Sequence, residues 1–150
     1  MYRDYYVSPI GIFKITANES SITGICVVDN IDKVYSNSIL MEAIKQLHEY
    51  FKGDRTSFSF SVEFKGTPFE KAVYKKVIDI PYGTTMSYQD VAAAINHKNA
   101  YRAVGNALNK NPLALFTPCH RVTKKGSLGG FGFGVSKKAW LLKHEGDIKF

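Results

Sequence analysis

The residues best suited to chemistry stand together in the stretch Thr117-Pro-Cys-His-Arg-Val122. Cys119 directly precedes His120, so a nucleophile and a general base are neighbours in the chain. The thiolate is the reactive form of cysteine, and a nearby base raises its fraction at neutral pH. Adjacent side chains on an extended chain point to opposite faces, so His120 would reach the thiol only at a bend or through a water molecule. Glu145 is a candidate carboxylate to orient the imidazole.

An isolated cysteine is also common as a small buried apolar residue, and the pattern alone leaves both interpretations open. The other cysteine, Cys26, lies too far away in the chain to form a zinc-binding pair with Cys119. The first residues lack the basic head and apolar stretch of a secretory signal, and no apolar run approaches the roughly 18 residues of a membrane helix. We therefore expect a cytoplasmic protein with free thiols, no metal, no cofactor and no membrane partner.

The charged residues are unevenly distributed along the 150-residue chain. Residues 1–64 hold 6 Lys and Arg against 8 Asp and Glu, a net −2, whereas residues 65–150 hold 14 against 5, a net +9. A basic module joined to a nearly neutral one indicates a polyanionic partner, most often nucleic acid. A lysine-rich solvated surface fits the same numbers.

The first part of the chain has the pattern of a small sheet with a helix. Residues 5–28 contain aromatic and β-branched runs broken by turn residues, which predicts a meander of short antiparallel strands. Residues 36–51 repeat apolar side chains every three or four positions, which predicts an amphipathic helix, and the alternation over 58–62 predicts another strand. We expect a boundary between residues 64 and 67, and hence an N-terminal α/β domain over 1–65 and a second domain over 66–150.

The second part is predicted to be mostly helical. Thr67-Pro-Phe-Glu70 is a capping box with a proline at the first helical position, and it opens a helix to about residue 80. Ser87-Tyr-Gln-Asp90 is a second capping box, which opens a helix to about residue 96. Asn99 is expected to cap a third helix that ends near residue 110. Two short helices across a turn are typical of a helix-turn-helix.

The segment around Cys119 has its own pattern. Residues 113–116 form an apolar run that looks like a strand leading to the cysteine. The glycines of residues 126–134 do not have the spacing of a P-loop or a dinucleotide site, and they suggest a wall where a flat ligand approaches the backbone. Ser136 is expected to cap a last helix that stops at Gly146.

Together these motifs resemble the O6-alkylguanine-DNA alkyltransferases, in which Pro-Cys-His-Arg-Val is the active-site motif. The order and spacing fit the family from about residue 67 to 146, whereas residues 1–64 resemble it only in size and in strand-then-helix character. The other shared motifs are Pro81-Tyr-Gly-Thr-Thr-Met-Ser-Tyr88, Tyr101-Arg-Ala-Val-Gly-Asn106, Asn111-Pro112, Gly126-Ser-Leu-Gly-Gly130 and Trp140-Leu-Leu-Lys-His-Glu-Gly146.

The resemblance implies an α/β (α+β) fold: a ribonuclease H-like N-terminal part with a small antiparallel sheet and a helix, and a mostly helical, winged helix-turn-helix-like C-terminal part. It also implies a monomer that binds double-stranded DNA carrying O6-alkylguanine and flips the damaged base out of the stack, as chemistry on a base requires. The alkyl group of O6-alkylguanine, and of O4-alkylthymine, would pass irreversibly to Cys119, once per molecule.

The resemblance also implies roles for individual residues. Tyr88 would aid flipping and protonate the departing guanine, His120 would deprotonate Cys119 through a water molecule, and Glu145 would hold the imidazole. Arg102 would fill the gap left by the flipped base, although a plain helix-surface arginine fits the sequence equally well. The implied DNA-binding residues are Asn99, Tyr101, Arg102, Ala103 and Gly105. The implied base pocket comprises Tyr88, Asn111, Pro118, Val122, Phe131, Gly132 and Phe133, with the carbonyls of Cys119 and Val122 accepting from the guanine amino group.

Three positions depart from the family pattern. Phe131 replaces an aromatic hydroxyl, so one side-chain hydrogen bond to the base is missing, while the Gly132 amide can still donate to O6. Phe133 stands where a small residue is common and is expected to narrow the pocket for bulky alkyl groups. Tyr101 occupies a position that is usually small on the groove-facing helix. The competing hypotheses are a lesion sensor without transfer activity, a helix-turn-helix regulator and a cysteine hydrolase.

Overall fold

The protein was analysed as a computed structural model, which describes residues 1–131 and 134–146. The chain divides into two compact units, of which the first comprises Met1–Phe64 with Pro112–Ala114 and the second comprises Lys65–Asn111 with Leu115–Phe150. The short piece at residues 112–114 belongs to the first unit, which a single break near residue 65 did not anticipate.

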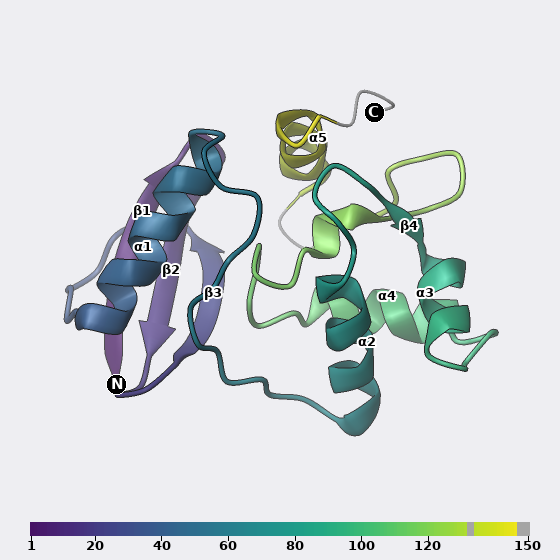
Figure 1. Ribbon diagram of the computed structural model, residues 1–150, viewed down its shortest axis with the longest axis horizontal. Helices are drawn as coiled ribbons and strands as arrows, with labels where there is room; N and C mark the ends of the chain where they lie inside the picture. The colour runs from purple at the N-terminus through teal and green to yellow at the C-terminus, as the bar shows by residue number, and fades with distance from the viewer. Residues whose placement is uncertain (132–133, 147–150) are drawn as a thin grey trace. The chain divides into compact units, whose positions relative to one another are not determined.

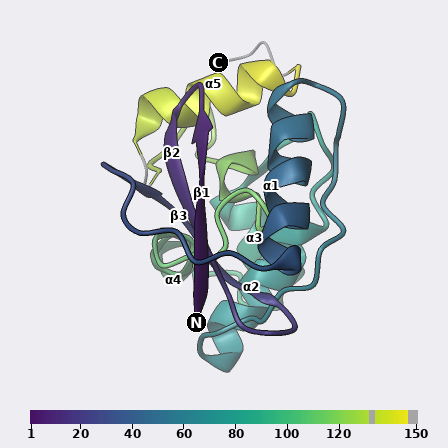
Figure 2. The same cartoon turned by 90° about the vertical axis from the view of Figure 1, so that its left-hand side faces the viewer.

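The first unit is built on an antiparallel sheet of order β1-β2-β3, formed by Tyr2–Ser8, Gly11–Ala17 and Ile22–Val28. Helix α1 (Ser38–Phe51) lies along this sheet (Figures 1 and 2) and begins where the Asn37 side chain accepts a hydrogen bond from the Leu40 amide at 2.9 Å. The core between sheet and helix is apolar; its fully buried side chains include Phe13, Ile15, Ile22, Ile25, Leu40, Leu47 and Tyr50. The predicted meander and helix are therefore confirmed.

The prediction of a strand over residues 58–62 was wrong. Only Val62 makes a single parallel bridge, to Ile22, with the Ile22 amide donating to the Ser61 carbonyl at 2.8 Å. The neighbouring position on β3 is taken by another segment, because the Ile25 amide donates to the Pro112 carbonyl at 2.9 Å and Leu113 bridges to Ile25. Two segments share the edge of β3, so neither is long enough to form a regular strand.

The second unit contains three helices that pack against one another: α2 (Pro68–Ile78), α3 (Tyr88–Ala94) and α4 (Tyr101–Asn109). Both predicted capping boxes are present, with Thr67 and Glu70 at α2 and Ser87 and Asp90 at α3. Helix α3 ends in a Schellman motif, in which Asn96 has a φ of 63° and the His97 amide donates to the Ala92 carbonyl at 2.9 Å. Helices α3 and α4 form the predicted helix-turn-helix.

The predicted N-caps of the third and last helices, and the predicted strand before Cys119, differ from the structure. Helix α4 is preceded by Ala100 rather than Asn99, because residues 97–100 close as a turn through the Ala100 amide and the His97 carbonyl. Helix α5 (Val135–His144) begins after Gly134, whose φ of 106° suits glycine, and not at Ser136. Residues 113–116 form no regular strand, because only Leu113 and Ala114 are in bridge positions and Leu115 has a φ of 70°.

A two-residue parallel pairing completes the second unit. Strand β4 (Met86–Ser87) pairs with β5 (Val122–Thr123), with Met86 opposite Val122. Strand β4 leads directly into α3, and β5 directly follows the short 3₁₀ turn η1 (Cys119–Arg121). The pairing thus fixes the start of the helix-turn-helix beside the cysteine.

A helix must be long and apolar to cross a bilayer. Within residues 1–131 and 134–146, no helix is long and apolar enough.

Candidate active site

Cys119 is presented by a sharp bend rather than by a strand. Pro118 has φ −78° and ψ 68°, the geometry of an inverse γ-turn, and the Cys119 amide donates to the Thr117 carbonyl at 2.7 Å. The Arg121 amide then donates to the Pro118 carbonyl at 2.9 Å, which closes the 3₁₀ turn. The chain therefore changes direction at the cysteine, and the opposite-face argument for an extended chain does not apply to Cys119 and His120.

Asn111 braces this bend from the end of α4. Its Nδ2 donates to the Thr117 carbonyl at 2.9 Å, and both residues are buried. The same carbonyl accepts from the Cys119 amide, so one oxygen links the helix-turn-helix to the cysteine loop. The contact fixes where the loop begins.

His120 and Glu145 meet inside the unit although 25 positions separate them. Nε2 of His120 lies 2.6 Å from Oε2 of Glu145, and both side chains are at most 1% exposed. Burial lowers the pKa of His120, and the Arg121 and Lys138 charges lower it further, while Glu145 opposes these effects. The net direction favours the neutral imidazole at His120.

Arg121 shares the same carboxylate, a contact that was not predicted from its position next to His120 in the chain. Its Nε donates to Oε1 of Glu145 at 2.8 Å and its Nη2 donates to Oε2 at 3.1 Å. The Nη1 group donates to the Ile80 carbonyl at 2.8 Å, and the guanidinium lies 5.6 Å from the centre of the Tyr82 ring. Burial alone would raise the pKa of Glu145, but the hydrogen bonds and charges of His120 and Arg121 hold it well below its usual range.

Lys138 is the second residue of this site that was not predicted from the sequence. Its side chain is 0% exposed, and its ammonium donates to the Val122 carbonyl at 2.6 Å and to the Gly130 carbonyl at 2.9 Å. Burial lowers the pKa of Lys138 to about 8, an effect that charge on Cys119 opposes. The sequence contained one signal for this burial. Lys138 precedes Leu141 and Leu142 by three and four positions, which places all three side chains on the same, buried face of α5.

Tyr88 stands at the first position of α3, close to the same groups. Its hydroxyl donates to the Gly130 carbonyl at 3.2 Å, and the Lys138 ammonium lies 5.7 Å from its ring centre. Burial raises the pKa of Tyr88, and charge on Cys119 raises it further. The phenol therefore stays protonated and is able to donate.

The Cys119 side chain is 6% exposed, and burial raises the pKa of its thiol. A hydrogen bond from the Asn111 side chain and the positive charge of Lys138 act in the opposite direction. A buried thiol of this kind needs a base to become nucleophilic, and His120 is the adjacent candidate.

The residues predicted to contact DNA lie on one side of α4 and just before it. Tyr101, Arg102 and Ala103 are exposed, as is Asn99 in the preceding turn, while Val104, Ala107 and Leu108 face the core. Gly105 is partly buried, and a Cβ there would come 3.9 Å from the Tyr88 ring. The predicted set is thus mostly an exposed surface, and Asn99 also lines an open hollow formed by residues 97–100.

The structure brings together part of the predicted base pocket. Pro118, Val122 and Asn111 are buried around the cysteine loop, and Phe131 is partly buried. Gly132 and Phe133 lie outside the described residues, so the expectations for the Gly132 amide and for a pocket narrowed by Phe133 stay predictions.

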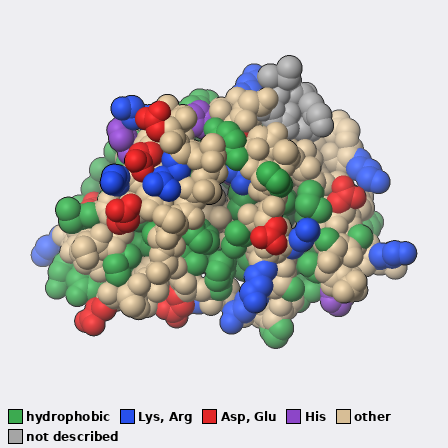
Figure 3. Space-filling view, viewed as in Figure 1, with side chains coloured by type: hydrophobic (Ala, Val, Ile, Leu, Met, Phe, Trp, Pro, Cys, Tyr) green, Lys and Arg blue, Asp and Glu red, His purple; other side chains and the backbone are tan. Residues whose placement is uncertain are grey.

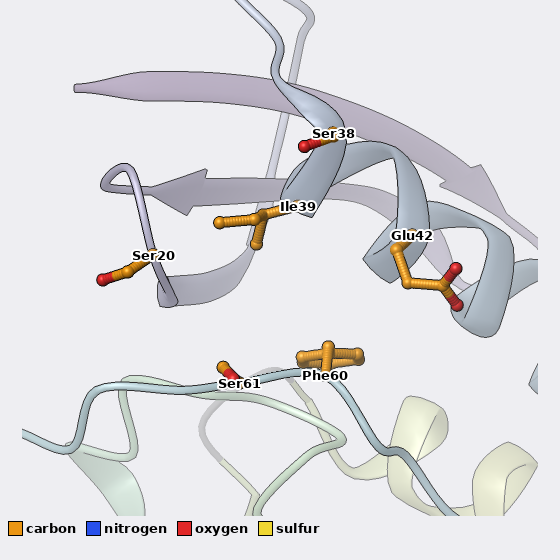
Figure 4. Close-up of a pocket in the computed structure, with 6 residues that line it drawn as sticks. All are labelled: Ser20, Ser38, Ile39, Glu42, Phe60 and Ser61. Atoms are coloured by element: carbon orange, nitrogen blue, oxygen red, sulfur yellow. The ribbon is translucent and has the colours of Figure 1, made fainter.

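Basic surface patches, pockets and clusters of metal-ligating side chains are the other places where a site could lie. On the face shown in Figure 3, Lys and Arg side chains are scattered and do not form one patch. Figure 4 shows an open pocket in the first unit, where Ile39 and Glu42 of α1 lie near Phe60 and Ser61, and none of the predicted site residues lines it. No three His, Cys, Asp or Glu side chains cluster as metal ligands would among residues 1–131 and 134–146.

Comparison with known proteins covers both parts of the chain. Residues 1–64 match the ribonuclease-like domain, and residues 68–147 the DNA binding domain, of 6-O-methylguanine DNA methyltransferase. A probable methylated-DNA–protein-cysteine methyltransferase of Acanthamoeba polyphaga mimivirus is 42% identical over 137 residues, which is 91% of each chain. A methylated-DNA–protein-cysteine methyltransferase of Methanosarcina barkeri is 38% identical over 153 residues, which is 97% of each chain.

The fold agrees with these sequence matches. The crystal structure of Mycobacterium tuberculosis OGT in complex with DNA superposes with a TM-score of 0.90 at 34% identity, covering 97% of this chain and 92% of that one. The match over residues 1–64 extends the likeness to the part where sequence motifs were absent, and the predicted mixed α/β fold is confirmed. The chain therefore belongs to the 6-O-methylguanine DNA methyltransferase family.

Proposed function

We propose that this protein repairs DNA directly, by transferring the methyl group of O6-methylguanine in duplex DNA to Cys119. The observation that carries the proposal is the buried cysteine, held at a bend directly before an imidazole that is 2.6 Å from a carboxylate. The family membership gives this site its substrate class, because the relatives are methylated-DNA–protein-cysteine methyltransferases.

The chemistry is a displacement at the methyl carbon. The thiol proton passes through a water molecule to His120, and Cys119 Sγ attacks the methyl group. The S–C bond forms as the bond from carbon to O6 breaks, and guanine leaves with the electron pair and takes a proton from the Tyr88 hydroxyl. A thioether is a poor leaving group, so the methyl group stays on sulfur and each molecule reacts once.

The helix-turn-helix supplies the DNA-binding surface in this proposal. Arg102, exposed near the start of α4, fills the space left by the flipped base. Phosphate contacts give most of the affinity, so binding is expected to weaken with salt and to be similar for unrelated duplexes. The protein would act where the DNA is, in the cytoplasm or nucleoid of a prokaryote or in the nucleus of a eukaryote.

The deciding experiment is intact-mass and peptide-mass analysis after incubation with a duplex that carries one O6-methylguanine. We expect a gain of one methyl group on the peptide that contains Cys119, saturating at one per molecule. An unmodified duplex and the Cys119→Ser variant are the controls, and neither should give a mass gain.

The main alternative is a lesion sensor that binds the damaged duplex without reacting. Tight binding to the O6-methylguanine duplex with no mass gain would establish that alternative and reject transfer. Strong preference for one undamaged sequence over another would instead indicate a helix-turn-helix regulator.

A further inference from the structure

Within the described part of the chain, the imidazole of His120 and the guanidinium of Arg121 both contact the Glu145 carboxylate, and of these two only His120 has a place in the transfer chemistry. His120 Nε2 lies 2.6 Å from Oε2, while Arg121 contacts both oxygens, at 2.8 and 3.1 Å. The Gly83 amide also donates to Oε1, at 3.3 Å. A carboxylate shared in this way has much of its charge balanced before the imidazole acquires a proton.

The sharing fixes the tautomer of His120. The pKa of Glu145 is held well below its usual range, so the carboxylate is ionised and accepts hydrogen bonds only. Nε2 of the neutral imidazole must therefore carry the proton, which leaves the lone pair on Nδ1. Nδ1 of His120 is buried and has no hydrogen-bond partner among the described residues. This nitrogen is the one available to take a proton.

Among the residues that the structure describes, four charged or titratable groups lie near His120. Glu145 lies just beyond α5, Arg121 and Cys119 belong to the same 3₁₀ turn, and Lys138 faces it from α5. Arg121 and Lys138 both oppose protonation of the ring, whereas Glu145 favours it. Of the two cations, only Arg121 is bonded to the carboxylate.

We propose that Arg121 is a positioning residue that keeps His120 neutral, with a free Nδ1, by sharing the Glu145 carboxylate in a two-point contact. Without the guanidinium, the full charge of Glu145 would act on the imidazole and convert it to imidazolium, which cannot accept the proton of Cys119. The Ile80 carbonyl holds the third arm of the guanidinium at 2.8 Å, so the arginine is fixed independently of His120. The expected effect of Arg121 on the methyl-transfer rate rests on the proposed function. Its expected effect on the protonation state of His120 does not.

The test is a titration of the imidazole nitrogens by ¹⁵N NMR, without DNA, on the full chain and on two variants. Arg121→Gln removes the charge, and Arg121→Lys keeps the charge but loses the two-point contact. In the native protein, His120 should be the Nε2–H tautomer and stay neutral below the ordinary midpoint of about 6.5. In Arg121→Gln, the midpoint should rise by about 1 to 3 pH units, and Arg121→Lys should stay closer to the native protein.

The transfer rate should follow the same change. The acidic limb of the pH profile for single-turnover methyl transfer is expected to move to higher pH in Arg121→Gln by the same amount as the NMR midpoint. Arg55→Gln is the matched control, because Arg55 pairs with Glu49 at 3.0 Å in the first unit, and it should change neither readout.

Two outcomes would overturn the inference. One is an imidazolium at His120 in the native protein at pH 7, and the other is an unchanged His120 midpoint in a folded Arg121→Gln variant. If Arg121→Gln does not fold, the native tautomer and the Arg121→Lys titration still decide. Absence of methyl transfer with the expected NMR shifts would reject the proposed function and leave the role of Arg121 intact.

Discussion

The buried ammonium of Lys138 donates to the main-chain carbonyl of Val122 at 2.6 Å. The same group donates to the Gly130 carbonyl, which also accepts from Tyr88. One lysine therefore joins helix α5, the strand after the cysteine and the glycine-rich segment. The family resemblance implies that the Val122 carbonyl also accepts from the guanine amino group, in which case Lys138 must share this oxygen with the base or release it.

Replacing Lys138 by methionine is expected to slow methyl transfer by about tenfold or more, because its charge favours the thiolate of Cys119 and its hydrogen bonds hold the pocket carbonyls. The measurement is the single-turnover rate with an O6-methylguanine duplex. Lys143→Met removes the same charge from an exposed position of α5 and should leave the rate unchanged. Equal rates in the two variants would contradict the role of Lys138.

Gly126 is the control position for a test of Gly129 in the glycine-rich segment. Both have left-handed backbones, with φ of 74° and 79°, so alanine at either position costs about 1 to 2 kcal/mol of strain. A Cβ at Gly129 would also lie 2.9 Å from the Tyr88 ring and 3.1 Å from the Lys124 amide nitrogen, whereas nothing lies within 4 Å at Gly126. We expect Gly129→Ala to lose more unfolding free energy in urea and to slow transfer, and Gly126→Ala to lose only the strain. Similar losses in both variants would show that the contact with Tyr88 has no effect.

The Tyr88 hydroxyl is expected to act as the proton donor to the leaving guanine. Tyr88→Phe should reduce the single-turnover rate by about 100-fold, the lower end of the effect of a positioned acid, while affinity for the damaged duplex stays close to native. Tyr82→Phe is the control, since its hydroxyl donates to the His144 carbonyl at 3.4 Å. A Tyr88→Phe variant as fast as the control would assign the proton to another source.

Glu145 should make the fold sensitive to acid. Its pKa in the folded protein lies well below the value of 4.5 expected for the unfolded chain, so the unfolded state binds the extra proton. Stability from this group is therefore present above pH 4.5 and is lost as the pH falls. Between pH 4.5 and 3, the free energy of unfolding should decrease more steeply in the native protein than in Glu145→Gln, by up to ~1.4 kcal/mol per pH unit. Urea unfolding across this range tests it, and parallel slopes would contradict it.

The sequence determined the structures that depend on a few neighbouring residues. The capping boxes at Thr67 and Ser87 form between positions three apart, so the starts of α2 and α3 could be predicted from composition and spacing. The antiparallel meander of β1 to β3, the amphipathic α1 and the helix-turn-helix were predicted for the same reason, whereas the alternation over residues 58–62 did not produce a strand. The residues of the cysteine motif could also be named, because their types and spacing carry the chemistry.

How these residues meet depends on contacts between distant parts of the chain. The pairing of Met86 with Val122 and the contact of His120 with Glu145 join positions 36 and 25 residues apart, and no local pattern specifies such pairings. In the sequence, Lys138 is one of many basic residues, whereas the packing of α5 places its ammonium against two carbonyls. Its charge is tolerated because buried polar groups there satisfy it, and whether such partners exist depends on the folded arrangement of distant segments.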